Sequence, residues 1–212
     1  RIALAGNPNC GKTTMFNALT GANQYVGNWP GVTVEKKEGK LKSKKVKEEV
    51  VVTDLPGIYS LSPYTLEEVV SRDYLLKENP DVIVDLVDAT NIERNLYLTT
   101  QLIETGVPVV IALNMADLLE KRGIKIDVAR LSMLLDCPIV ETSALKGEGL
   151  DKLIDEAIKT AKKKEADLPK EIFNKDLEDA VSAAAEVLPS SIDANKKRWY
   201  AVKFLEKDSK VA

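Results

Sequence analysis

A complete phosphate-binding loop near the start of the chain constrains its fold more than any other feature. Residues 6–13 read Gly-Asn-Pro-Asn-Cys-Gly-Lys-Thr, between an apolar run at residues 2–5 and a helical pattern at residues 15–19. The chemistry needs this order of strand, tight loop and helix N-terminus, because backbone N–H groups of the loop and the first helical turn bind the phosphate oxygens. The segment therefore predicts a site for a nucleoside triphosphate.

Each residue type in this loop has its own task. Gly6 and Gly11 let the backbone curl around phosphate oxygens without a side chain in the way. The ammonium group of Lys12 is placed against the β- and γ-phosphates, and the hydroxyl of Thr13 can hold Mg²⁺. The residues of the loop expected to contact the nucleotide are Gly6, Asn7, Pro8, Asn9, Cys10, Gly11, Lys12, Thr13 and Thr14.

Composition narrows the class of protein. The 212 residues are 44% apolar with a net charge of −3, which suits one α/β domain with a smaller appendage and gives no global signal for nucleic-acid binding. There is no histidine, and the two cysteines (Cys10 and Cys137) match no metal-ligand spacing and fit a reducing compartment. No secretory signal is present, and no apolar run is long enough to cross a bilayer. Because Arg1 already lies in the first predicted strand, the chain is expected to be a soluble fragment of a longer protein.

Apolar runs alternate with helical patterns through the first three quarters of the chain. This alternation predicts an α/β fold with a mostly parallel sheet flanked by helices on both faces. Residues 34–42 are expected to pair with residues 46–53 as an antiparallel hairpin at the sheet edge. The other predicted strands are residues 2–5, 50–53, 82–87, 107–113 and 138–140, and the predicted helices are residues 66–76, 95–104, 128–135 and 150–162.

A second, smaller domain is predicted at the C-terminal end. A lysine run followed by Leu-Pro near residues 162–169 indicates a helix end and a hinge. We therefore predict a nucleotide-binding domain at residues 1–164 and a helical domain at residues 165–212, with truncation at the end of the chain left open. Apolar residues at helical spacing mark the faces of its helices and are expected to form its core: Phe173, Leu177, Ala180, Val181, Ala184 and Leu188, then Trp199, Val202 and Leu205.

Two later segments favour guanine as the base. The carboxylate of Asp117, which closely follows the run at residues 107–113, can accept hydrogen bonds from the guanine ring N–H and exocyclic amine, a donor pair that adenine lacks. Asn114 can tie this segment to the phosphate loop. The segment after residues 138–140 resembles a loop whose backbone N–H groups meet the guanine carbonyl oxygen. The predicted base-contacting residues are Asn114, Met115, Ala116, Asp117, Ser143, Ala144 and Leu145.

Metal and γ-phosphate contacts are predicted in two further segments. Asp54, at the end of a strand, is placed to hold a water on Mg²⁺, and Gly57 lets a backbone N–H approach the γ-phosphate. Thr33, in the loop-like stretch 23–33, is the natural second protein ligand of Mg²⁺, so loss of the γ-phosphate would release that loop. The expected Mg²⁺ ligands are Thr13, Thr33 and Asp54, and the expected nucleotide contacts are Trp29, Pro30, Gly31, Val32, Thr33, Asp54, Leu55, Pro56 and Gly57.

Together these segments resemble the N-terminal G domain of FeoB, the family of prokaryotic ferrous-iron transporters, which is a P-loop GTPase of the translation-factor-like class. The resemblance covers about residues 1–160, and residues 198–206 resemble the GDI-like helical domain that follows it and is described in that family as stabilising bound GDP. The segments that carry it are residues 6–9, 27–33, 54–61, 72–74, 87–90, 94–98 and 114–117.

The resemblance implies a GTP-hydrolysing regulatory domain with GTP or GDP, Mg²⁺ and K⁺ as cofactors. It implies a place at the cytoplasmic face of the inner (cell) membrane, tethered to a membrane-embedded permease domain of the same polypeptide. Small accessory Feo proteins and oligomerisation are left open as further interactions, and no nucleic-acid partner is expected.

Hydrolysis needs a group that the residues alone do not provide. Ile58 stands where many GTPases have the Gln that orients the attacking water, and no Lys or Arg lies in residues 14–34 or 55–70 to act as an arginine finger. The resemblance implies a K⁺ ion on the phosphates instead, held by the side-chain oxygen of Asn9 and the backbone carbonyls of Gly27 and Trp29. The residues expected to act in catalysis are Asn9, Lys12, Thr33 and Gly57.

Two other functions remain open from the sequence. One is a related K⁺-dependent GTPase of ribosome assembly or tRNA modification, which predicts an RNA-binding appendage with basic and aromatic surfaces. The other is a non-catalytic module whose GTP-bound switch loops recruit a partner. Phosphate release in K⁺ would distinguish an enzyme from such a module.

Overall fold

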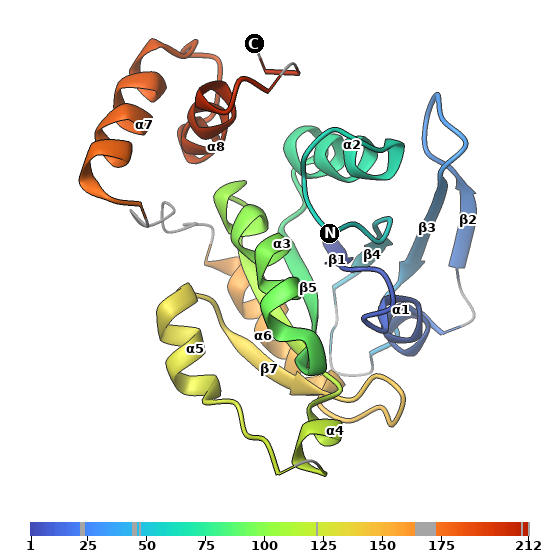
Figure 1. Cartoon of the computed structure of the whole chain (residues 1–212). Helices are drawn as coiled ribbons and strands as arrows, with labels where there is room; N and C mark the ends of the chain where they lie inside the picture. The colour runs from blue at the N-terminus through green and yellow to red at the C-terminus, as the bar shows by residue number, and fades with distance from the viewer. Residues whose placement is uncertain are drawn as a thin grey trace.

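A sheet of seven strands forms the centre of the computed structural model, in the order β2-β3-β4-β1-β5-β6-β7 (Figure 1). The structure describes residues 1–21, 24–43, 46, 48–121, 123–163, 173–208, 210 and 211. Strand β3 runs antiparallel to its neighbours and the others are parallel, as the sequence predicts. The strands are β1 (Ile2–Gly6), β2 (Gln24–Asn28), β3 (Glu35–Lys40), β4 (Val51–Asp54), β5 (Val82–Asp88), β6 (Val109–Asn114) and β7 (Ile139–Thr142).

The register of the parallel strands brings four predicted motifs to one edge of the sheet. Leu4 is paired with Asp54, and Asn114 with Thr142, so the carboxyl ends of β1, β4, β6 and β7 lie together. In open α/β sheets, ligands bind outside the carboxyl ends of the strands where the strand order reverses, which here is at β1. The topology therefore places the phosphate loop, Asp54, Asn114 and the segment after Thr142 around one site.

Helices cover both faces of the sheet, and the buried side chains form one cluster on each face. Met15, Phe16 and Leu19 pack with Leu153 and Ile154 on one face. The other cluster contains buried side chains from the helices α2 and α3, and partly buried side chains from α5 pack against it. The helices of this part are α1 (Lys12–Thr20), α2 (Leu66–Asp73), α3 (Ile92–Glu104), α4 (Ala116–Glu120), α5 (Val128–Leu135) and α6 (Leu150–Lys162).

The prediction of a loop at residues 23–33 is wrong for residues 24–28 and is confirmed for residues 29–33, which form a turn. Residues 24–28 form β2, which pairs antiparallel with β3 and takes the outermost position in the sheet, so β3 is not the edge strand. Tyr25 and Val26 favour extended structure, but both are more than half exposed, so no buried face signals the strand in the sequence. Asn23 lies outside the described residues.

The helix predicted at residues 66–76 changes its hydrogen-bonding pattern part-way. After α2 ends at Asp73, a π-helical turn follows, η1 (Tyr74–Glu78), and Asn79 with a φ of 47° ends it. The short helix α4 is not predicted from the sequence. The hinge predicted near residues 162–169 lies mostly outside the described residues, as does the boundary between residues 164 and 165.

The C-terminal helices α7 (Lys175–Val187) and α8 (Ala194–Leu205) pack against each other through Val181, Ala184 and Ala201. Figure 1 shows this pair at the end of the molecule opposite α4. Trp199 is buried as predicted, whereas Phe173, Leu177 and Leu205 are more than a third exposed and do not form the expected core.

A buried ion pair joins this helical pair to the α/β part. The guanidinium of Arg72 on α2 lies 2.7 Å from Asp208 and stacks over the ring of Trp199 at 4.6 Å, with both charged side chains almost inaccessible to solvent. At a second contact, a Cβ on Gly106 would overlap the carbonyl group of Asn195 at the start of α8. Among the described residues, no helix combines the length and hydropathy needed to cross a membrane.

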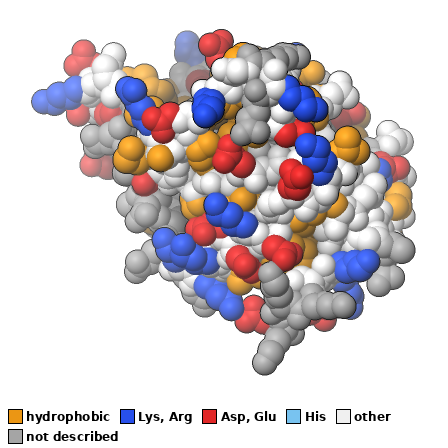
Figure 2. Space-filling view, turned by 90° about the horizontal axis from the view of Figure 1, so that it is seen from below, with side chains coloured by type: hydrophobic (Ala, Val, Ile, Leu, Met, Phe, Trp, Pro, Cys, Tyr) orange, Lys and Arg blue, Asp and Glu red, His pale blue; other side chains and the backbone are white. Residues whose placement is uncertain are grey.

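Viewed from the end at which α4 lies, acidic and basic side chains are interspersed over the coloured surface (Figure 2). Such a surface creates no large field of one sign. Selection of a ligand at this end must therefore come from individual contacts.

Candidate nucleotide-binding site

The phosphate loop joins β1 to α1 in the conformation that an anion site requires. Asn9 and Gly11 have left-handed backbones, with φ values of 67° and 94°, and Gly11 is the N-cap of α1. The first turn of α1 contains no acidic residue, so the positive end of the helix dipole is not neutralised from within the helix. Thr13 and Thr14 are exposed there. The loop thus presents a helix N-terminus to a negatively charged group.

The ammonium of Lys12 meets the carboxylate of Asp54 at 2.6 Å, and both side chains are about nine-tenths buried. Burial raises the pKa of Asp54 above its ordinary value, although the positive charge of Lys12 opposes this effect. The lysine predicted to bind phosphate and the aspartate predicted to serve Mg²⁺ therefore lie side by side, each paired with the other.

The segment that follows Asp54 lies directly against the phosphate loop. Leu55 donates its backbone N–H to Leu4 at 3.0 Å, and Ile58 donates to the carbonyl of Gly6 at 3.3 Å. A Cβ on Gly57 would lie 3.2 Å from the Cα of Pro8, closer than side chains normally come to a backbone. Glycine at position 57 therefore permits the approach of this backbone to the loop.

The side chain of Asn114 connects three segments that are distant in the sequence. Its amide donates to the carbonyl of Cys10 at 2.9 Å, and its oxygen accepts the N–H of Ala144 at 3.0 Å. The predicted tie between the base-selecting segment and the phosphate loop is confirmed, and it extends to the segment at residues 143–145. The path of this amide also explains Gly11, because a Cβ there would collide with it.

Asp117 lies near the start of α4 and is paired with Lys146, at 2.7 Å. The hydrogen bond from Lys146 is the main reason why the pKa of Asp117 is below its ordinary value. Met115 stands before α4 with a φ of 63°, and Leu145 is almost fully exposed. Lys146 was not predicted as a site residue, although its position directly after residues 143–145 is a signal that could have indicated it.

Thr33 is not brought to the predicted Mg²⁺ ligands in this conformation. It is exposed in the turn between β2 and β3, and none of the hydrogen bonds or ion pairs of the described residues joins it to Thr13 or Asp54. The turn is closed by Trp29, which donates its N–H to Val34 at 2.9 Å and accepts the N–H of Val32 at 3.3 Å.

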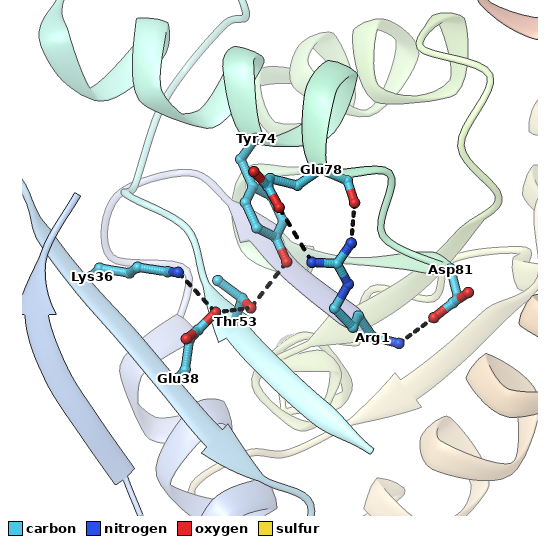
Figure 3. Close-up of polar contacts among 7 residues, drawn as sticks. All are labelled: Arg1, Lys36, Glu38, Thr53, Tyr74, Glu78 and Asp81. Atoms are coloured by element: carbon cyan, nitrogen blue, oxygen red, sulfur yellow. Dashed lines mark hydrogen bonds and ion pairs between the residues drawn. The ribbon is translucent and has the colours of Figure 1, made fainter. Parts of the chain in front are cut away.

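The side chain of Trp29 is buried and contacts the ring of Tyr74 edge-on, with 5.3 Å between ring centres. From Tyr74 a polar chain leads back to β3, as Figure 3 shows: Tyr74 donates to Thr53 at 3.0 Å, Thr53 donates to Glu38 at 3.2 Å, and Glu38 pairs with Lys36 at 3.0 Å. The ammonium of Lys36 lies 5.0 Å from the centre of the Trp29 ring, so the contacts form a closed ring that begins and ends at Trp29.

This ring of contacts fixes the end of β2 to the residue that precedes Asp54 and to η1. Burial raises the pKa of Tyr74 further above neutral pH, where the tyrosine hydroxyl is already protonated and can donate to Thr53. No motif of the sequence indicates the role of Tyr74.

Comparison with known proteins decides the family. Residues 1–157 match the family model of ferrous iron transport protein B, and residues 173–212 match the model of the FeoB cytosolic helical domain. The chain belongs to the FeoB family. The alternative of a GTPase in ribosome assembly or tRNA modification is thereby set aside.

FeoB proteins of several bacteria are similar over nearly the whole chain. The Fe(2+) transporter FeoB of Shigella flexneri is 43% identical over 98% of the chain, and a fusion of Fe(2+) transport protein A with FeoB from Porphyromonas gingivalis is 47% identical over all of it. The chain spans 27% and 26% of the lengths of these two relatives.

Solved structures of FeoB also match. A mutant of NFeoB from S. thermophilus bound to mGDP is 55% identical with a TM-score of 0.93, covering 99% of this chain and 80% of its own. The mGMPPNP-bound NFeoB from S. thermophilus is 55% identical with a TM-score of 0.86, covering 99% of this chain and 78% of its own.

Proposed function

We propose that this chain binds GTP and GDP at the carboxyl edge of its sheet and hydrolyses GTP with the help of K⁺, as a regulatory part of a ferrous-iron transporter. The observation that carries the proposal is the bridge made by Asn114 between the phosphate loop and the two base-selecting segments. It is supported by the NFeoB relatives, whose structures contain mGDP and mGMPPNP. The same proposal assigns residues 1–164 to the G domain and residues 165–212 to the helical domain.

Binding of a triphosphate would replace the ion pair between Lys12 and Asp54. The ammonium of Lys12 would turn to the phosphates, and the carboxylate of Asp54 would serve Mg²⁺ together with the hydroxyl of Thr13. These oxygen donors are the kind that Mg²⁺ prefers. Asp117 would accept the two guanine donors, and in doing so would share or release its bond to Lys146.

The donors expected for K⁺ are also of the right chemistry. The left-handed backbone at Asn9 places an exposed amide at the tip of the loop, and backbone carbonyls of Gly27 and Trp29 would add further oxygens. A bound K⁺ would supply positive charge at the phosphates in place of an arginine finger. In the present conformation Gly27 is paired with Lys36 in the sheet, and the carbonyl of Trp29 accepts a hydrogen bond from Val32. The end of β2 would therefore leave the sheet and the turn at residues 29–34 would open, which would also free Thr33 to reach Mg²⁺.

Iron transport itself belongs to the rest of the polypeptide in this proposal. The relatives are about four times as long as this chain, which leaves room for a membrane-embedded permease domain, and the chain would lie at the cytoplasmic face of the cell membrane. The fused Fe(2+) transport protein A of the Porphyromonas gingivalis relative favours a small accessory Feo protein as a partner.

Hydrolysis should depend on K⁺ through Asn9. We expect phosphate release from GTP to be several-fold faster in KCl than in NaCl at equal ionic strength, and we expect Asn9→Ala to remove this difference, because an amide oxygen of the ion's shell is lost. Asn91→Ala, which changes an exposed asparagine at the start of α3, serves as the control. Equal rates in the two salts would reject the role of K⁺. Tight GTP binding without any turnover would instead indicate the non-catalytic interaction module.

A further inference from the structure

We propose that Arg94 and Gln101 on α3 are positioning residues for the segment that follows Gly57, and that Arg94 connects this segment to the phosphate loop. The inference rests on the proposed GTP hydrolysis and adds residues that none of the nucleotide motifs contains. It starts from the fact that Ile58 cannot orient a water, so the backbone near Gly57 must be held in place by other side chains.

Arg94 makes two contacts with different parts of the site. Its backbone carbonyl accepts the side-chain N–H of Asn7 in the phosphate loop, at 3.4 Å. Its guanidinium carbon lies 4.1 Å from the centre of the ring of Tyr59, two residues after Gly57. Stacking of an arginine on an aromatic ring is attractive, so Arg94 holds the ring of Tyr59 against α3.

Gln101 holds the same segment two helical turns further along α3. Its side-chain oxygen accepts the backbone N–H of Leu61 at 2.6 Å, and Leu61 is fully buried. Residues seven apart lie on one face of a helix, and the buried Leu98 stands between them on that face. Arg94 and Gln101 thus hold the two ends of residues 59–61 against one face of α3.

Between these two points the segment is held from α2. Ser60 donates its hydroxyl to Glu68 at 3.1 Å, and Glu68 also completes the capping box of α2 with Thr65. Glu68 is therefore occupied in structure and is a poor candidate for a general base. Three residues thus hold the segment: Arg94, Gln101 and Glu68. Of these three, only Arg94 also contacts the phosphate loop.

The contact of Arg94 is also the one that can open. Tyr59 is 41% exposed and Arg94 is exposed, whereas Leu61 and Glu68 are buried. A stack at the surface contributes little to stability, so its loss should leave the fold intact and change only the position of the segment.

Kinetics of matched variants test this role. We expect Arg94→Ala to lower kcat for GTP about tenfold, since small displacements of a reacting geometry are costly, while KM for GTP and Kd for GDP change less than about twofold. Tyr59→Phe should retain activity because the ring remains, Tyr59→Leu should resemble Arg94→Ala, and the double variant should lose no more than either. Glu93→Ala, at the exposed neighbouring position, should behave as the wild type. Unchanged kcat in Arg94→Ala would overturn the proposal, as would a parallel loss of GDP affinity and thermal stability.

Amide hydrogen exchange separates this proposal from the proposed hydrolysis. In the GDP-bound protein, exchange in a peptide covering residues 58–62 should rise about two- to fivefold in Arg94→Ala, as expected for loss of a surface stack, and about tenfold or more in Gln101→Ala, which leaves a buried N–H without its acceptor. Glu93→Ala should show wild-type exchange. If the wild type hydrolyses no GTP, the proposed function fails while this measurement still stands. Exchange unchanged in both variants would refute the positioning role even in an active enzyme.

Discussion

Lys12→Met is expected to weaken binding of GDP and GTP by roughly 10- to 150-fold, because one charge-assisted hydrogen bond to phosphate contributes about 1.5–3 kcal/mol. Methionine retains most of the aliphatic stem and removes only the ammonium. Fluorescence titration with a labelled GDP measures the loss. Lys152→Met, an exposed lysine on α6, should bind as the wild type and serves as the control.

Loss of the ammonium also leaves Asp54 without its partner in a buried position. Removing one member of a buried ion pair costs about 3–5 kcal/mol, so the single variant should be less stable as well as weaker in binding. The double variant Lys12→Met with Asp54→Asn removes both charges and should recover much of the stability without recovering affinity. Wild-type affinity in a folded Lys12→Met protein would contradict the role of the loop.

The second large effect is expected at Asp85, in the middle of the central strand β5. Its side chain is fully buried and accepts a hydrogen bond from Thr99 at 2.5 Å. Burial raises the pKa of Asp85 from 3.8 to about 7, although the bond from Thr99 favours the charged form. The folded protein therefore keeps the proton over a pH range in which the unfolded chain has lost it.

Stability should consequently fall as pH rises between about 4 and 7. In that range the native state binds more protons than the unfolded state, at a cost of ~1.4 kcal/mol for each pH unit, so the total loss above pH 7 is about 4 kcal/mol. Asp85→Asn cannot ionise and should raise the melting temperature at about pH 8 by roughly 10 °C, while giving little or no gain near pH 4.

Thermal melts at several pH values compare this variant with Asp155→Asn, an exposed aspartate on α6. Burial also raises the pKa values of Asp54 and Glu104, but these two groups titrate in the wild type and in both variants. The difference in melting temperature between the wild type and Asp85→Asn therefore reports on Asp85 alone. An identical pH dependence in wild type and Asp85→Asn would contradict this account, because it would mean that folding does not raise the pKa of Asp85.

The parallel core of the fold could be predicted because its signals are local. Five apolar runs correspond to β1 and β4–β7, and the buried strands need such runs because helices cover both faces. The phosphate loop, Asp54, Gly57 and Asn114 could be predicted to share one site because each lies at the end of a strand or shortly after it. The geometry then places them at one edge of the sheet.

The other features of the fold and of the site depend on contacts between residues that are distant in the sequence. Strand β2 is paired by β3 and carries a polar, half-exposed sequence, so its pattern does not differ from that of a loop. Three of these contacts join residues that are far apart along the chain: the ring that joins Trp29 to Tyr74, the pair between Asp117 and Lys146, and the stack of Arg94 on Tyr59. Of these residues, Lys146 has a sequence signal in its position after residues 143–145, whereas the pairing of Trp29 with Tyr74 and of Arg94 with Tyr59 follows from no periodicity or motif.

Isothermal titration calorimetry with GDP and with ADP, each with Mg²⁺, tests the central claim most directly. We expect GDP to bind with a dissociation constant on the order of micromolar, and ADP to bind at least about 100-fold more weakly, since adenine leaves the carboxylate of Asp117 without its two donors. Equal affinities for the two nucleotides, or no heat from either, would contradict the account.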